Sequence, residues 1–404
     1  MLYCFERYAT QRVFYVNLAR PFPAFLKQVQ FDLVIFHDLL LCRRSLPRRF
    51  AFIVKQAAPV RAISGYRIAT VQDEFTQTKL LNDFLLNFDV QHIFSVAPPS
   101  EWAKIYPSLD RNKTKLDTSL TGYLDRGMID RIETLAASYP LRDIDIGYRA
   151  SYARYSLGFV GYLKVKIAEV VRQAAQGTPL KIDVSNDPKD TIVGEDWYRF
   201  LLRCKYTLGV ESGASVLDTD GTIETAVNDY LASHPTASFE AVQRACLREH
   251  DGELKLQVIG PRHLEACVTR TCQILTEGEY NGILKPNLHY LPLKKDFSNL
   301  NEVLEAVKRD DQRAEIVERA YNDIVLSNKY SFESYVNNIL EKSLGTKYTW
   351  SEISPTEERL YQQNRRREAH TWHYVRLRSR VVSTILNSLP RRTFNAIEAF
   401  MKRT

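Results

Sequence analysis

The chain has 404 residues, of which 45% are apolar and 25% are charged, the balance of an ordinary globular protein of two or three domains. This composition excludes collagen-like and low-complexity proteins, and no run of about 18 apolar residues is present to form a membrane-spanning helix. Six cysteines lie scattered in apolar segments without a C-x-x-C pair. They indicate reduced thiols, so we expect a cytoplasmic protein.

The net charge of +7 belongs to the C-terminal end of the chain. Residues 355–404 contain eleven basic and four acidic residues, so the rest of the chain is neutral. The basic residues alternate with apolar and aromatic ones, including Trp372, Tyr374 and Phe400. We therefore predict a basic helical tail over 346–404 that contacts the inner face of a membrane. The alternative is a helix that packs back on the first domain with its arginines in solvent.

The first half of the chain alternates strand-like runs with helical periodicity. Phe31–His37, Tyr66–Phe75 and Val90–Val96 predict buried strands, and residues 76–88 predict a helix between the last two. This alternation is typical of a parallel sheet, so we predict a Rossmann-like domain over 1–140 whose first strand is missing. Ligands of such sheets bind beyond the carboxyl ends of the strands, where His37 and Asp73 fall.

The second half repeats the pattern after a looser stretch, 120–143, which we interpret as a linker or crossover. Strands are expected at Asp143–Arg149, 180–185, 206–212 and 272–278, with helices between them. A helical insertion is expected at about 222–257, and a long helical stretch after residue 298 is interrupted near Arg309–Asp311. The fold class is therefore α/β, with a second Rossmann-like domain over 141–345.

The segment "PRHLEACVTRTCQIL" (261–275) carries the strongest binding signal. Pro261 suits the first turn of a helix, whose free N–H groups and partial positive charge attract an anion. Arg262 and His263 would add hydrogen-bond donors for a phosphate or diphosphate. Glu265, one turn along, would accept hydrogen bonds from sugar hydroxyls. The alternative is that Arg262 caps a neighbouring strand and pairs with Glu265.

Three further segments contribute weaker candidates. In "LGVESGASV", a predicted strand ends at Glu211, Ser212 and Gly213, where the glycine permits close approach of a ligand. In a second segment Arg149 ends a strand, and two glycines and Lys164 lead into a helix, which again fits phosphate. Tyr280 could stack on a base or a sugar, although tyrosines of this kind are more often half buried.

Taken together, "DIGYR", "LGVESGASVLDTDG", "PRHLEA" and "EGEYNGIL" resemble the donor-binding half of GT-B glycosyltransferases, closest to bacterial surface-polysaccharide and CgeB-like enzymes. The resemblance implies two facing Rossmann-like domains, a nucleotide-sugar donor, and a glycan or lipid-linked acceptor. By that resemblance Arg149, Lys164 and Arg262 would hold the diphosphate, and Glu265 would bind the ribose. We expect no metal and no cofactor, because arginine and lysine can balance the charge of the leaving group.

The chain departs from that family at two positions. Gln257 stands where many retaining members have a second glutamate, and Arg270 stands at a usual glycine. The choice between retaining and inverting transfer therefore stays open. An inverting enzyme needs a general base, for which His37 and Asp73 are candidates, and Glu211 is the third candidate for the chemistry.

Two alternatives to a transferase remain. The chain could be a non-catalytic docking subunit of a polysaccharide assembly complex, or a nucleotide-sugar epimerase on the same fold. A nucleic-acid partner is not expected, because the body of the protein is neutral and carries no nucleic-acid-binding module.

Overall fold

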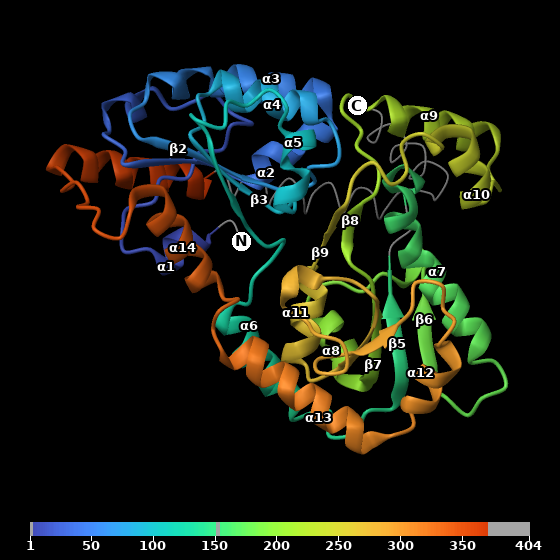
Figure 1. Ribbon diagram of the computed structural model, residues 1–404. Coiled ribbons are helices and arrows are strands. Elements are labelled where there is room, and N and C mark those ends of the chain that lie inside the picture. Colours follow the sequence, from blue (N-terminus) through green and yellow to red (C-terminus); the bar gives the residue numbers. More distant parts are fainter. Residues whose placement is uncertain (1–2, 151–153, 371–404) are drawn as a thin grey trace, which may run out of the picture. The chain divides into compact units, whose positions relative to one another are not determined.

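The computed structural model describes residues 3–150 and 154–370 and divides into two compact units. The larger unit contains residues 1–9, 33–51 and 65–348 and holds both parallel sheets (Figure 1). The smaller unit contains residues 10–32, 52–64 and 349–404. Inside the smaller unit the Phe14 ring contacts those of Phe31 and Tyr361, with ring centroids 5.3 and 5.2 Å away. The domain boundaries expected near residues 140 and 345 stay predictions.

The N-terminal sheet has four parallel strands in the order β1-β2-β3-β4. Their bounds are β1 (Leu33–Phe36), β2 (Tyr66–Val71), β3 (His92–Ser95) and β4 (Lys115–Thr118). The accompanying helices are α2 (Asp38–Leu41), α3 (Pro47–Ala57), α4 (Thr78–Asn87) and α5 (Trp102–Ile105). The three predicted strands and the predicted helix are confirmed. The sequence missed β4, because this partly exposed strand has a single apolar residue, Leu116.

The C-terminal sheet has five parallel strands in the order β11-β10-β7-β5-β6. Their bounds are β5 (Ile144–Arg149), β6 (Ile182–Ser185), β7 (Cys204–Gly209), β10 (Cys272–Thr276) and β11 (Leu291–Leu293). The chain winds outward in one direction from β5 to β6 and in the other from β7 to β10 and β11. The switch point between β5 and β7 is where open parallel sheets bind ligands.

Helices cover both faces of this sheet (Figure 1). One apolar core contains side chains of α7 (Gly158–Ala174), α12 (Leu300–Ala306) and α13 (Asp310–Ala320). Clusters on the opposite face draw on α6 (Arg126–Ala136), α8 (Glu195–Arg203) and α11 (Pro261–Val268). An α/β fold with two parallel sheets is therefore confirmed, as is the helix break near Arg309–Asp311, which separates α12 from α13.

The stretch 120–143 is not a simple linker. It contains the helix α6, whose first turn is capped by Asp125, which accepts a hydrogen bond from the Met128 N–H at 3.0 Å. The apolar residues of this helix, Ile129 and Ile132, are buried in a core cluster with α11. The loose appearance of the sequence reflects an amphipathic helix with only one buried stripe.

The segment between β7 and α11 contains helices and a small sheet. Helices α9 (Thr222–Ser233) and α10 (Phe239–Val242) lie between β8 (Ser212–Ala214) and β9 (Leu256–Val258), which pair antiparallel. Backbone hydrogen bonds also join the segment after β2 to the segment after β8. The Gln77 N–H donates to the Asp218 carbonyl at 2.7 Å, and the Asp218 N–H donates to the Phe75 carbonyl at 2.8 Å.

At the two ends of the described chain, α1 (Cys4–Tyr8) packs near α14 (Phe332–Leu344), and residues 355–370 are helical. The aromatic part of the basic tail, with Trp372, Tyr374 and Phe400, lies outside the described residues. Across residues 3–150 and 154–370, every helix is too short or too polar to span a bilayer.

Candidate functional site

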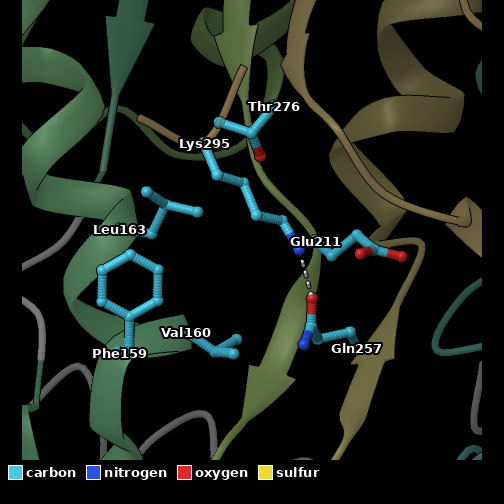
Figure 2. A pocket seen from close by; sticks show the side chains of 7 residues that line it. All are labelled: Phe159, Val160, Leu163, Glu211, Gln257, Thr276 and Lys295. Carbon is cyan, nitrogen blue, oxygen red and sulfur yellow. Dashed lines mark hydrogen bonds between the residues drawn. The ribbon is translucent and has the colours of Figure 1, made fainter. Parts of the chain in front are cut away.

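A pocket of about 70 Å³ opens beside the carboxyl ends of β7 and β10 (Figure 2). Helix α7 supplies an apolar wall, formed by Phe159, Val160 and Leu163. The other wall is polar and is formed by Glu211, Gln257, Thr276 and Lys295. In Figure 2 the Lys295 side chain extends between these walls toward Gln257. The pocket has the mixed lining expected of a small polar ligand with apolar surface.

Glu211, a predicted site residue, lines this pocket. Its side chain is buried, and one carboxylate oxygen accepts a hydrogen bond from the Tyr280 N–H at 2.8 Å. Burial raises the pKa of Glu211, whereas that hydrogen bond and the positive charge of Lys295 lower it. The carboxylate is therefore partly committed to holding the loop after β10.

Lys295 and Gln257 form the polar wall. The Lys295 Nζ donates a hydrogen bond to the Gln257 Oε1 at 3.2 Å. The sequence analysis missed Lys295, although Lys294 and Lys295 directly follow the apolar tripeptide "LPL", which forms β11, the edge strand of the sheet. Gln257, noted only as a departure from the family pattern, proves to be a pocket residue.

Lys164 and Arg262 form a cationic cluster near the start of α11. Burial lowers the pKa of Lys164, and the positive charges of Arg262 and Arg154 lower it further. Asp73 is the carboxylate that opposes this effect. Within the described residues no carboxylate forms an ion pair with Lys164. Lys164 is half-buried, and a partly desolvated ammonium without a partner is costly, a cost that a bound anion would offset.

Arg262 is exposed, and its guanidinium contacts one side chain and one backbone carbonyl. Its guanidinium lies over the Trp197 ring at 4.7 Å and donates a hydrogen bond to the Arg149 carbonyl. Glu265 does not pair with it in an ion pair. Instead one Glu265 oxygen accepts a hydrogen bond from the Trp197 Nε1 at 2.8 Å, and burial raises the pKa of this carboxyl group.

The side chain of Arg149 is committed to the sheet. It donates hydrogen bonds to the Asp183 carbonyl at 2.8 Å and to the Asp183 carboxylate at 2.7 Å, and it lies over the Phe200 ring at 4.6 Å. These contacts hold β5 to β6 and leave the guanidinium mostly buried. Only the backbone of Arg149 therefore contacts the cationic cluster, through Arg262.

His263 and Tyr280 are buried structural side chains. The His263 Nδ1 accepts a hydrogen bond from the Gly260 N–H at 2.9 Å, which caps α11. Burial lowers the pKa of His263 to about 4. Tyr280 is fully buried, and its hydroxyl donates to the Thr276 carbonyl at 2.7 Å. Both rings are buried, and their predicted contacts with a phosphate and with a base or sugar stay predictions.

Ser212 and Gly213 belong to the small sheet β8–β9. Gly213 has φ +132°, and a Cβ atom there would collide with the Leu256 carbonyl. The glycine is therefore needed for the close approach of two strands rather than for a ligand. Ser212 pairs with Val258, and its hydroxyl lies close to the Gly260 backbone just before α11.

The start of α7 is not a free anion site. The Asp251 carboxylate accepts hydrogen bonds from the Phe159 N–H at 3.1 Å and the Ser215 hydroxyl at 2.6 Å. Gly158 has φ +69° and lacks the Cβ that would collide with both Asp251 and Ser215. Gly158, the first residue of this helix, therefore makes room for the Asp251 carboxylate, which already accepts a hydrogen bond from an N–H group at the helix start.

His37 and Asp73 both follow strands of the N-terminal sheet, as predicted. The His37 Nδ1 accepts a hydrogen bond from the Leu39 N–H at 3.2 Å and lies 2.7 Å from an Asp38 carboxylate oxygen. Its Nε2 is buried and has no hydrogen-bond partner among the described residues. Asp73 is exposed and has φ +53°. Two buried side chains hold the loop around it.

Those two residues are Arg44 and Glu74, both fully buried. The Arg44 guanidinium donates hydrogen bonds to the carbonyls of Leu41, Gln72 and Thr76, at 2.9, 2.8 and 3.1 Å, and to that of Asp73. The Glu74 carboxylate accepts from the Val96 N–H at 2.9 Å and from the hydroxyls of Ser95 and Tyr106. They fix the backbone at the carboxyl end of β2.

Lys164 and Arg262 thus lie close enough for their charges to interact. Glu211 lies just beyond the carboxyl end of β7, in the pocket. The structure turns Arg149, His263 and Tyr280 toward the protein interior. Among the described residues, His, Cys, Asp and Glu side chains form no group of three that could hold a metal ion. The functional roles of all the predicted site residues stay predictions.

Comparison with family models finds no match, and neither does comparison with curated proteins. Among solved structures, the chain is similar to Anabaena HepE in complex with UDP, at 10% identity and a TM-score of 0.43, over 77% of this chain and 78% of that one. It is also similar to apo OtsA, at 12% identity and a TM-score of 0.41, over 82% and 75% of the two chains. The catalytic domain of starch synthase IV from Arabidopsis thaliana, bound to ADP and acarbose, has 10% identity and a TM-score of 0.40, over 78% and 72%.

Proposed function

We propose that the chain is a glycosyltransferase that transfers a sugar from a nucleoside-diphosphate donor to a glycan or lipid-linked acceptor, in the cytoplasm. The observation that carries this proposal is the half-buried Lys164 ammonium, which interacts with the positive charge of Arg262 and has no ion-pair partner among the described residues. A nucleoside diphosphate supplies the anion that this cluster lacks. The resemblance of the sequence to GT-B enzymes supports the same reading.

The chemistry of transfer suits these residues. As the bond from the sugar to the diphosphate breaks, negative charge grows on the leaving oxygen. Lys164, Arg262 and the partial positive charge at the start of α11 would stabilise that charge more in the transition state than in the ground state. Glu265 and Trp197 would then lie beside the nucleoside part of the donor.

His37 is the better candidate for a general base. Its Nε2 is buried and has no hydrogen-bond partner in the described chain, and its Nδ1 lies 2.7 Å from an Asp38 carboxylate oxygen. With its proton on Nδ1, facing Asp38, the ring would take a proton at Nε2 from an acceptor hydroxyl that reaches it. Asp73 remains a second candidate, and Glu211 would position the sugar rather than react. Whether the sugar keeps or inverts its anomeric configuration is decided by a separate measurement of the configuration in the product.

Calorimetric titration with UDP, GDP, CDP and ADP tests the donor site. We expect one of them to bind, and Lys164→Met and Arg262→Ala each to weaken that binding by about ten- to a hundredfold, the loss of a charge-assisted hydrogen bond. Lys166→Met is the matched control, because Lys166 lies two residues along α7 and pairs with Glu169 at 3.8 Å. No binding of any diphosphate, or equal loss in the control, would contradict the proposal.

A second assay separates a transferase from the alternatives. The matching nucleotide sugar is incubated with the protein, with and without a glycan or lipid-linked acceptor, and the products are separated. Transfer to the acceptor supports the proposal, with a His37→Gln variant expected to lose most of the rate. Conversion of the donor to an isomer without acceptor would identify an epimerase, and binding without turnover would favour a docking subunit.

A further inference from the structure

A second charged surface lies in the segment that follows β1, starting two residues after His37. Five of the exposed residues between the start of α2 and the first turn of α3 make up what we name the arginine patch: Leu39, Arg43, Leu46, Arg48 and Arg49. Leu39 is 52% exposed and Leu46 is 40% exposed. Leu39 lies in α2, Arg43 in the 3-10 turn and Leu46 directly after it, just before the start of α3.

The charge of this segment is one-sided. The sequence contains no acidic residue between Asp38 and Asp73, and seven basic ones, namely Arg43, Arg44, Arg48, Arg49, Lys55, Arg61 and Arg67. Arg44 is buried and fully bonded to backbone carbonyls, so it has a structural role. The guanidinium groups of Arg43, Arg48 and Arg49 are exposed and have neither an ion pair nor a hydrogen bond within the described chain.

The position of two of these arginines costs stability. Arg48 and Arg49 stand in the first turn of α3, which contains no acidic residue. The start of a helix carries partial positive charge, so cations there are unfavourable. These charges therefore do not serve the helix, and an external anionic surface would relieve their repulsion.

We propose that the arginine patch docks on an anionic lipid surface, with the arginines at the phosphate level and Leu39 and Leu46 inserted among the headgroups. Exposed apolar side chains interleaved with basic ones are the features of an interfacial membrane contact. A nucleic acid would satisfy the arginines but would offer no apolar environment for the leucines. This inference rests neither on the proposed transfer reaction nor on the basic tail.

Co-sedimentation of the full chain with phosphatidylcholine vesicles, with and without phosphatidylserine, tests the proposal. We expect binding to the anionic vesicles alone. The triple variant Arg43→Gln, Arg48→Gln, Arg49→Gln should weaken it on the order of a hundredfold, because each basic residue near the surface adds attraction. The double variant Leu39→Ser, Leu46→Ser should weaken it about tenfold without changing the net charge.

Two triple variants of equal charge loss serve as controls. One replaces Arg126, Arg131 and Arg203 by Gln, all exposed and each paired with a carboxylate. The other replaces Arg376, Arg378 and Arg380 of the basic tail by Gln. Circular dichroism confirms that each variant is folded. Three results would overturn the proposal: an equal loss of vesicle binding in a control variant, unchanged vesicle binding of the patch variants, or equal binding to neutral vesicles. We expect the patch variants to bind nucleotide as the unchanged protein does.

Discussion

His263 is a residue whose chemistry is decided by its burial. Its ring is 6% exposed, and its Nδ1 accepts the Gly260 N–H that begins α11. A protonated ring could not accept that bond, and burial already lowers the pKa to about 4. The residue type suggested a phosphate ligand, but the environment makes it a neutral helix cap.

This environment predicts a pH-dependent stability. Between pH 6.5 and 4 the unfolded chain binds a proton at His263 that the folded chain does not, so stability falls as the pH falls through this window. The shift corresponds to about 3 kcal/mol of unfolding free energy between pH 7 and pH 4. In His263→Gln, which keeps an acceptor for the Gly260 N–H, that part of the pH dependence should vanish in urea titrations. An unchanged slope would contradict the buried neutral histidine.

At the scale of elements, the small sheet β8–β9 and the start of α7 frame the polar pocket. Gln257 of β9 and Glu211 just before β8 reach the pocket, while Phe159, Val160 and Leu163 come from α7. Asp251, which precedes β9, caps α7 by accepting a hydrogen bond from the Phe159 N–H, and so connects the small sheet to this helix. The pocket therefore depends on backbone approaches that only glycine permits, at Gly158 and Gly213.

Replacing Gly213 by Ala tests that dependence. The Cβ would meet the Leu256 backbone at a residue with φ +132°, so we expect a loss of about 3 kcal/mol or more in unfolding free energy. Gly177→Ala is the matched control, because Gly177 also has positive φ, +77°, but nothing lies within 4 Å of the added Cβ. It should cost about 1 kcal/mol. Equal losses in denaturant titrations would show that the β8–β9 contact is unimportant.

At the scale of the whole molecule, both parallel sheets belong to one compact unit. Backbone pairing between residues 75–79 and 218–219 joins them, and Glu101 adds a second link. The Glu101 carboxylate accepts hydrogen bonds from the Lys255 N–H at 3.1 Å and from the Lys104 Nζ at 2.9 Å, and Lys104 also donates to the Glu253 carbonyl at 2.7 Å. Such links favour cooperative unfolding of the two sheets.

Hydrogen exchange measures that cooperativity. We expect the amides of β2 and β7 to exchange with the same opening free energy. Glu101→Ala should lower both by about 1–2 kcal/mol, because it leaves the Lys255 N–H unpaired. A variant in which only β2 loses protection would indicate that the sheets unfold separately.

The sequence predicted much of the fold but little of the site geometry. Strand and helix patterns depend on neighbours in the chain, and β1, β2, β3, β5, β6, β7 and β10 were identified from them. The short or polar strand β4 and the helix α6 were missed because their periodicity is weak. Lys164 and Arg262 were found as basic residues near helix starts, whereas Lys295 and Trp197 carried no local signal strong enough to single them out.

By itself the sequence determined that the protein is α/β, with two parallel sheets and polar residues at strand ends, because those properties follow from local patterns of apolar and polar residues. Tertiary structure alone decided what each polar side chain does. Arg149 meets Asp183 across 34 positions of sequence, Trp197 meets Glu265 across 68, and Glu211 meets Tyr280 across 69. Such partners come from the order and packing of the strands, which no local spacing encodes. The same packing leaves Lys164 without an ion-pair partner among the described residues.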